Sequence, residues 1–452
     1  MPQNSQITES ELFPKGYIKK LLLPLVIEQF LAVTIGLADT IMVSSNGDAA
    51  ISGVSLVDQI NVLLIQVFAA LATGGAIVVS QYIGRNEREN ARSAAKQLFL
   101  ITTLAACIIM TVCLCFCPYI LRMIFGSVED GVMRNCKIYF YMSVVSYPFL
   151  ALYNSGSAIF RSMGKSRITM YISIVMNTIN VAGNAIFIFG FGMSVFGAAL
   201  ATLISRAAGG IIITAMSHNK NNPIYIDFKS LRLKFSLIKR ILYVGVPNGI
   251  ENGMFQIGKL MVSRIIADLG TAAIAANSVA GTVAMVSNIP GSAIGLGLVT
   301  IVGQAMGAGL TKTAEKYSKK LLGLTYLLTN ILNILIFVSA PFIIAMYREL
   351  SPEATQDALR IVRVFCIVSS VTWPLAFTLP NSLRAAGDVR FTLVVSMSAM
   401  WLCRVALCYL LCYTFNMGLD GVWYAMYADW LFRIIFFVAR FARGKWKSCK
   451  VI

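Results

Sequence analysis

The stretch Gly47-Asp48-Ala49-Ala50-Ile51 returns further along the chain as Gly270-Thr271-Ala272-Ala273-Ile274, at an offset of 223 residues (270 − 47 = 223). Pro24 and Glu28 return at the same offset as Pro247 and Glu251. Further matches at this offset are Gln81, Gly84, Ala91, Arg161, Gly164 and Arg167, which return as Gln304, Gly307, Ala314, Arg384, Gly387 and Arg390. A single offset over so much of the chain indicates that one half duplicates the other.

The composition is that of an integral membrane protein. Hydrophobic residues make up 57% of the 452 residues and charged residues only 13%, whereas soluble domains carry roughly 25% charged residues. The mean hydropathy is +0.74. Apolar runs of about 20 residues, the length that crosses a bilayer, recur along the whole chain. Because no long loop separates these runs, there is no room for a soluble catalytic domain.

The apolar runs predict twelve membrane-spanning helices, six in each half of an all-α fold. Their approximate limits are 17–43, 52–83, 94–118, 132–160, 168–190, 195–217, 240–267, 275–308, 317–346, 355–383, 391–414 and 419–441. Because six is even, both halves enter the membrane in the same sense, as a parallel repeat about an axis along the membrane normal.

Four segments follow from this repeat. We expect an N-terminal six-helix lobe (1–217), a cytoplasmic linker (218–239), a C-terminal six-helix lobe (240–441) and a basic cytoplasmic tail (442–452). Two membrane halves around a central cleft are typical of secondary transporters that work by alternating access.

The net charge of +18 reflects membrane topology rather than nucleic-acid binding. Basic residues gather in alternate loops, as the positive-inside rule predicts for cytoplasmic segments. Both termini are therefore expected in the cytoplasm, in a multi-pass protein of the cell inner (cytoplasmic) membrane. Arg122, Lys137 and Arg348 depart from this pattern on the opposite side. No short apolar segment with a cleavage site precedes the first span, so we expect no signal peptide.

Two acids lie in the first span, where a charge in hydrocarbon needs a reason. Glu28 and Asp39 are eleven residues apart, which brings them within about 20° of the same helix face. Such a stripe favours binding stations for a cation or a proton. The alternative is that one of them pairs with a buried arginine or caps a backbone break near Pro24. Pro24 lacks an N–H and could act as a hinge or as a static kink.

A polar stripe lies in the fifth span. Asn177, Asn180 and Asn184 follow i, i+3, i+7 spacing, which is one helical face. Such a face meets protein or water rather than lipid, and it could hydrogen-bond a carboxylate. Thr202 in the sixth span could join it. The alternative is amide packing between helices.

The second half does not copy this chemistry. Val262 stands where the repeat aligns Asp39 (262 − 39 = 223). Glu251 persists, and Lys259 and Arg404 are added in neighbouring spans. We therefore expect the first half to handle the coupling ion and the second to shape a substrate cleft. Asp429 and Arg433 are i, i+4 neighbours and are expected to form a structural pair.

Several other functions are excluded. Gly164-Lys165-Ser166 lacks the preceding glycine of a phosphate loop, since residue 159 is isoleucine. His218 is the only histidine, which rules out a two-histidine zinc motif. Cys113, Cys115 and Cys117 alternate on a helix and cannot converge on one metal. We expect no metal, no cofactor and no enzymatic activity; the only ion called for is a coupling H⁺ or Na⁺.

These motifs together resemble the multidrug and toxic compound extrusion (MATE) family, of the bacterial NorM/DinF-like kind. The resemblance covers about residues 15 to 440. It rests on Leu37 to Val43, Gln81 to Gly84, Arg161 to Gly164, Asn180 to Asn184, Gly197 to Thr202, Pro247 with Glu251, and Ser382 to Asp388. It implies a twelve-helix, two-lobed antiporter that exports cationic or amphipathic small molecules against inward H⁺ or Na⁺.

The resemblance also implies roles for residues. Asp39 is similar to the family's first-helix carboxylate, whose protonation is linked to bending at Pro24. Asn180, Asn184 and Thr202 match its hydrogen-bonding partners, although an Asp is often found at position 184. Glu251 resembles the seventh-helix acid of the NorM-type branch, while that branch's tenth-helix acid aligns with Trp373.

Three points stay open. A flippase for a lipid-linked precursor or polysaccharide is the alternative function, which Lys259 and Arg404 would suit. The residues do not separate H⁺ from Na⁺, and they do not name the substrate. We expect a monomer in the lipid bilayer, with small molecules as its partners.

Overall fold

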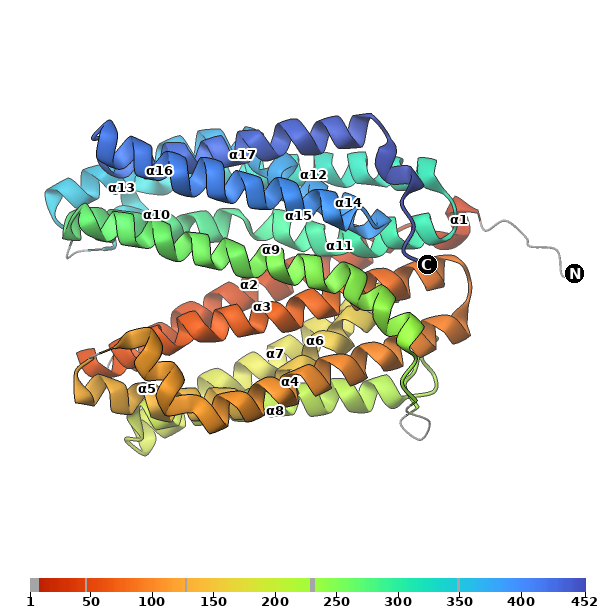
Figure 1. The fold of residues 1–452 in the computed structure, drawn as a ribbon, viewed down its shortest axis with the longest axis horizontal. Coiled ribbons are helices and arrows are strands. Elements are labelled where there is room, and N and C mark those ends of the chain that lie inside the picture. Colours follow the sequence, from red (N-terminus) through yellow and green to blue (C-terminus); the bar gives the residue numbers. More distant parts are fainter. Residues whose placement is uncertain (1–7, 45–46, 127, 228–231, 348–349) are drawn as a thin grey trace, which may run out of the picture. The chain divides into compact units, whose positions relative to one another are not determined.

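A computed structural model describes residues 8–44, 47–126, 128–227, 232–347 and 350–452. The side chains at 37–41, 44, 48 and 49 lie outside this description. The described residues are almost entirely helical (Figure 1). By length and composition alone, nine helices among them could cross a membrane. The chain is a multi-pass membrane protein, and its helices group into the twelve predicted spans.

Two compact units make up the chain, and each has its own helices. The N-terminal unit consists of Phe13–Gly249 and Ile452, and the C-terminal unit of Ile250–Val451 and Met1–Leu12. The division falls inside one long helix, α9 (Phe235–Asp268). The limits expected for lobes, linker and tail remain predictions, and residues 228–231 of that linker lie outside the described residues.

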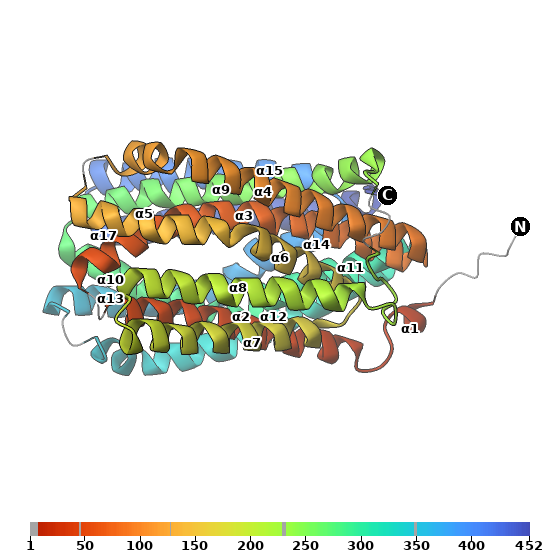
Figure 2. The ribbon, with the colours of Figure 1, turned by 90° about the horizontal axis from the view of Figure 1, so that it is seen from below.

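The N-terminal unit is a bundle of long helices, in which α7 and α8 lie side by side (Figure 2). Besides the first part of α9 it contains α2 (Tyr17–Ser44), α3 (Asp48–Gly84), α4 (Arg88–Phe125), α5 (Asp130–Val145), α6 (Tyr147–Ser162), α7 (Ser166–Asn184), η1 (Ala185–Gly190) and α8 (Ser194–His218).

The C-terminal unit repeats this order, with more interruptions. Its helices are α1 (Glu9–Leu12), the rest of α9, α10 (Thr271–Ser287), α11 (Ile289–Gly307), α12 (Thr311–Ala345), α13 (Pro352–Trp373), η3 (Pro374–Thr378), α14 (Leu379–Ala386), α15 (Val389–Ser398), η4 (Ala399–Ala406), α16 (Leu407–Tyr409), η5 (Leu410–Thr414), α17 (Gly418–Ala442) and η6 (Lys445–Ser448).

Two predicted spans are interrupted by a non-helical residue that lies two residues before a proline. The fourth span changes from α5 to α6 at Ser146, two residues before Pro148. The eighth changes from α10 to α11 at Asn288, two residues before Pro290. Proline suits a first helical turn because its missing N–H has no partner there. Since mostly apolar residues lie on both sides of each break, hydropathy alone predicted single helices.

Helix α9 packs closely on α3 inside the N-terminal unit. A Cβ atom added at Gly74 would lie 2.6 Å from the carbonyl oxygen of Ile241 and 2.8 Å from the backbone nitrogen of Gly245. Small residues of this kind let the backbones of two membrane helices come into contact. Within a bilayer the hydrophobic effect does not drive helices together, so this close van der Waals packing stabilises their association. Gly74 therefore allows the first part of α9 to pack closely on α3.

Candidate functional site

A polar cavity of about 150 Å³ lies within the N-terminal unit. Helices α2, α3, α5, α7 and α8 line it through Gly36, Val43, Ile51, Val54, Ser55, Asp58, Tyr139, Asn184, Ala198, Thr202 and Arg206. The polar residues come in helical pairs, since Ser55 and Asp58 are i, i+3 on α3 and Thr202 and Arg206 are i, i+4 on α8. Each pair puts two polar side chains on one face of its helix.

The asparagine stripe of the fifth span reaches this cavity at one end. Asn184, which is 1% exposed, lines it together with Thr202. Asn180, one turn earlier, donates from Nδ2 to Oγ1 of Thr202 at 3.2 Å, and its own Oδ1 is buried without a hydrogen-bond partner in the described structure. Three residues singled out from the sequence are therefore brought together by α7 and α8.

Two charged residues of the cavity were missed in the sequence. Asp58 accepts from Nδ2 of Asn61 at 3.3 Å, and Asn61 in turn accepts from the hydroxyl of Tyr147 at 2.7 Å. Arg206 donates to the hydroxyl oxygen of Ser146 at 2.8 Å. Both networks end at the break between α5 and α6. The signal was present, because a charge inside an apolar span marks a candidate functional residue wherever it occurs.

Neither acid of the first span is found among the described residues that line the cavity. Asp39 belongs to α2, but its side chain lies outside the described residues. Glu28 is not among the residues that line the cavity. It forms an ion pair with Arg161, with Nη1 and Oε1 3.3 Å apart, and its other oxygen accepts from Thr169 at 2.8 Å. The alternative of a buried arginine partner is therefore the arrangement found for Glu28.

Pro24 lies inside α2 and is supported from α7. A proline at this position leaves the carbonyl of Lys20 without its helical N–H. The hydroxyl of Ser166 donates to the carbonyl oxygen of Leu21 at 2.6 Å and lies 3.4 Å from that of Lys20. Serine side chains commonly satisfy carbonyls that proline frees in membrane helices. The repeat aligns Val389 with Ser166, so Pro247 has no hydroxyl there (389 − 166 = 223).

The C-terminal unit holds its charged residues in pairs. Glu251 contacts Arg384, with Nη2 and Oε1 2.5 Å apart. Arg404 lies 3.6 Å from Asp429, which also forms the predicted i, i+4 pair with Arg433 at 2.9 Å. Asp429 is completely buried. Most of the charge expected in this half is therefore neutralised inside the unit.

Lys259 differs from these pairs, because it forms no ion pair with a carboxylate among the described residues. It is exposed in this structure and is repelled electrostatically by Arg404. Phe255, one turn earlier on α9, lies 5.3 Å beneath the guanidinium of Arg404. Lys259, Phe255 and Arg404 thus form one cationic and aromatic region of the C-terminal unit.

Comparisons with known proteins decide the family. The family model described as MatE matches the chain twice, over residues 24–186 and 247–410, and the two matches begin 223 residues apart (247 − 24 = 223). The chain belongs to the MATE family. Both halves of the MATE fold are therefore present, in agreement with the internal repeat and the twelve predicted spans.

Relatives cover nearly the whole MATE chain. A Bacillus subtilis protein called uncharacterized transporter YisQ is 27% identical and covers 94% of this chain and 93% of its own length. A Thermotoga maritima protein called probable multidrug resistance protein NorM is also 27% identical, over 96% of this chain and 93% of its own. The matched family is one of membrane transporters rather than enzymes.

Solved structures share the fold. A multidrug resistance MATE family transporter of the MOP superfamily, in its outward-facing conformation, superposes with a TM-score of 0.90 at 20% identity, over 97% of both chains. A MOP superfamily transporter from Pyrococcus furiosus, described as having a reverse polarity of its binding pocket, also gives 0.90 at 20% identity over 97% of both chains. At this identity the likeness concerns the fold.

Proposed function

We propose that this protein is a secondary active multidrug efflux antiporter. It exports cationic or amphipathic small molecules in exchange for H⁺ or Na⁺ by alternating access. The observation that carries the proposal is the cavity of the N-terminal unit, where Asn184, Thr202, Asp58 and Arg206 line one space inside a membrane bundle. Ionisable groups inside a membrane bundle are costly, and they commonly mark the path of a substrate or an ion. The relatives named as multidrug resistance proteins support the same role.

The coupling-ion site is proposed to comprise Asp39, Asn180, Asn184 and Thr202. A carboxylate with amide and hydroxyl oxygens can hold either a proton or Na⁺, because both need oxygen acceptors. Ion binding and substrate binding would then oppose each other, as reciprocal linkage requires. Glu28 was grouped with these residues from the sequence. We assign it instead to holding α2, since Arg161 already compensates its charge.

Pro24 is proposed as the hinge of this site. A helix without the Lys20 to Pro24 hydrogen bond bends more easily. The hydroxyl of Ser166 lies within hydrogen-bond distance of the freed carbonyl of Lys20 and of the neighbouring carbonyl of Leu21. Bending at Pro24 would change the position of Asp39, which lies on the same helix fifteen residues later (39 − 24 = 15). The hinge thereby couples the ion site to the conformation of α2.

The C-terminal unit is proposed to shape the substrate cleft through Glu251, Lys259 and Arg404. Glu251 and Arg404 are each compensated by an ion-pair partner, so neither presents a full charge to the cleft. We propose that they fix the shape of the cleft and offer hydrogen bonds. Lys259 and the ring of Phe255 would set the charge and the apolar contact of this side. An amphipathic substrate suits such a combination.

The flippase alternative needs a strongly cationic cleft for phosphate. Arg404 is partly neutralised by Asp429 at 3.6 Å, which leaves Lys259 as the main cation of this group. That favours efflux of small molecules. Movement of a lipid-linked sugar by purified protein in vesicles, with no drug-dependent ion flux, would favour the flippase.

The test is transport in proteoliposomes with imposed H⁺ or Na⁺ gradients, using ethidium as the probe cation. Asp39→Asn should abolish the response to one gradient, whereas Glu89→Gln, which alters an exposed carboxylate paired with Arg92 on α4, should transport like the wild type. Full ion-driven transport by the Asp39→Asn variant would overturn the proposed coupling site. The proposal also places both termini in the cytoplasm of a monomer in the inner membrane, which cysteine labelling from each side would check.

A further inference from the structure

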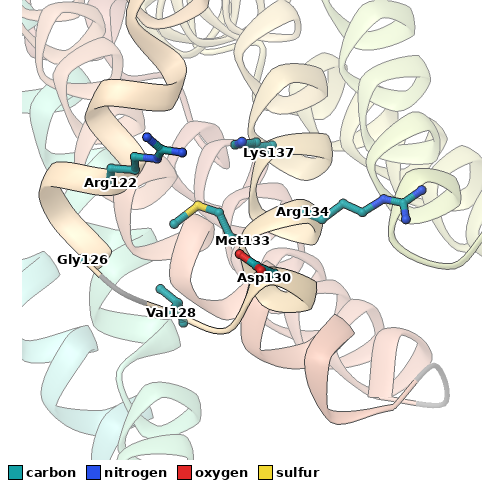
Figure 3. A pocket seen from close by; sticks show the side chains of 7 residues that line it. All are labelled: Arg122, Gly126, Val128, Asp130, Met133, Arg134 and Lys137. Carbon is teal, nitrogen blue, oxygen red and sulfur yellow. The ribbon is translucent and has the colours of Figure 1, made fainter.

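The corner between α4 and α5 forms a second pocket, of about 450 Å³, at the surface of the N-terminal unit. Figure 3 shows Arg122 on α4 and Lys137 on α5 reaching toward one another across it, with Met133 nearby. Arg134 also lines the pocket and extends from α5 on the other side. The proposed transport function uses none of these residues.

The lining carries an excess of positive charge. Three of its four ionisable residues are cations, and Asp130 is the one carboxylate among them. Within the described part of the chain, Arg122, Arg134 and Lys137 form no ion pair. Glu129 is exposed at the start of α5 and is not a lining residue. Like charges held around one concavity repel each other, and a bound anion would relieve that repulsion.

This cationic corner lies at the end of the unit where membrane topology predicts few cations. Helix α4 begins beside the basic connection between the halves, since Arg92 donates to the carbonyl of Pro223 at 3.2 Å and Gln97 to that of Arg232 at 2.8 Å. The pocket lies at the other end of α4, roughly 50 Å away along the axis. Positive residues cluster on one side of membrane proteins, so topology does not explain Arg122 and Lys137.

Exposed apolar side chains lead away from the pocket along α4. Phe116, Tyr119 and Met123 follow i, i+3, i+7 spacing and are 54%, 75% and 87% exposed, so they form one exposed apolar stripe. Arg122 is three residues beyond Tyr119, which puts it on an adjoining part of the surface. A cationic pocket joined to an exposed apolar stripe matches a molecule with an anionic head and apolar chains, whereas a free phosphate would use the pocket alone.

We propose that the pocket formed by Arg122, Arg134 and Lys137 binds the headgroup of an anionic phospholipid. The phosphate lies between Arg122 and Lys137, where a guanidinium and an ammonium can both donate to its oxygens. The acyl chains lie against Phe116, Tyr119 and Met123. The lipid joins α4 to α5 and so stabilises the hairpin that ends at the break beside Ser146.

The test compares full-length protein in nanodiscs of phosphatidylcholine with and without phosphatidylglycerol, by thermal unfolding and by native mass spectrometry of retained lipid. Phosphatidylglycerol should raise the unfolding temperature of the wild type. The double variant Arg122→Gln/Lys137→Gln should bind it about thirtyfold less tightly, the loss expected for two interfacial cations. Arg264→Gln, which removes an exposed cation of the C-terminal unit, should behave like the wild type.

Two outcomes would overturn the proposal. One is equal retention of phosphatidylglycerol by the double variant and the wild type, with both folded in phosphatidylcholine. The other is full stabilisation of detergent-solubilised protein by inorganic phosphate, which would identify the occupant as a soluble anion. The double variant Arg122→Lys/Lys137→Gln keeps the positive charge at residue 122. If it binds phosphatidylglycerol more tightly than Arg122→Gln/Lys137→Gln, the charge of this residue, rather than its packing, holds the lipid.

Discussion

Arg161 forms an ion pair with Glu28 at 3.3 Å in the N-terminal unit, and the duplicate pair, Arg384 with Glu251 at 2.5 Å, recurs in the C-terminal unit. In each case an arginine from the last turn of a helix meets an acid on the first span of its own half. All four residues are largely buried, and each carboxylate has a cationic partner, which is what the membrane interior requires. The repeated pair is therefore a structural element of each half.

Breaking one of these pairs should destabilise its unit. In Arg161→Met the carboxylate of Glu28 stays buried and keeps, among the described residues, the hydroxyl of Thr169 as its hydrogen-bond donor. We expect a loss of about 3 kcal/mol in unfolding free energy. The double variant Glu28→Gln/Arg161→Met should regain at least half of it, because no unpaired charge remains. Unfolding in detergent by intrinsic fluorescence measures both. A double variant as unstable as the single one would show that packing of Arg161, rather than its charge, matters.

Removing the hydroxyl that supports the Pro24 region should loosen α2. Ser166→Ala deletes the hydrogen bond to the carbonyl of Leu21, and we expect about 1 kcal/mol of local destabilisation. Hydrogen exchange of residues 17–28 should become faster. The matched control is Ser217→Ala, since that buried hydroxyl bonds a carbonyl of its own helix. Equal exchange in the two variants would argue against the support that we assign to Ser166.

The charge of Arg206 should influence which compounds the cavity accepts. Arg206→Met removes a positive charge from a space that also contains Asp58, so repulsion of a monocation falls. We expect export of a monocation such as ethidium to rise relative to that of a zwitterion by about fivefold, equivalent to about 1 kcal/mol. Arg167→Gln, an exposed cation at the start of α7, is the control. An unchanged ratio in Arg206→Met would remove the cavity from substrate selection.

Adding a methyl group where α3 meets α9 should disturb the N-terminal unit. In Gly74→Ala the new Cβ would lie 2.6 Å from a backbone carbonyl oxygen, which no side-chain rotation can relieve. We expect a loss of about 2 kcal/mol in unfolding free energy. Gly323→Ala on α12, whose Cβ would meet no atom within 4 Å, should be neutral or slightly stabilising. Thermal unfolding of both proteins in one detergent makes the comparison, and equal stability would contradict the close contact.

Much of the architecture could be predicted because it depends on local, repeated properties. The first span was expected at 17–43 and α2 is Tyr17–Ser44; the last was expected at 419–441 and α17 is Gly418–Ala442. The bilayer sets a minimum length for a crossing helix, so apolar runs locate the spans, although α4 (Arg88–Phe125) extends beyond the expected 94–118 at both ends. The breaks at Ser146 and Asn288 were missed, because they interrupt backbone geometry without interrupting hydrophobicity.

Some polar residues of the cavity could likewise be predicted from the sequence, and others could not. Asn180, Asn184 and Thr202 could be assigned to one cluster, since helical spacing alone brings the two asparagines onto one face. Asp58 and Arg206 were missed, although both are charges in apolar spans, because their common cavity exists only when α3 and α8 pack. The sequence by itself determined the duplication, the membrane environment and the spans. These depend only on the repeat offset, the hydrophobic composition and the length of the apolar runs. Only the tertiary structure decided that Glu28 meets Arg161, because residues so far apart along the chain become neighbours through helix packing.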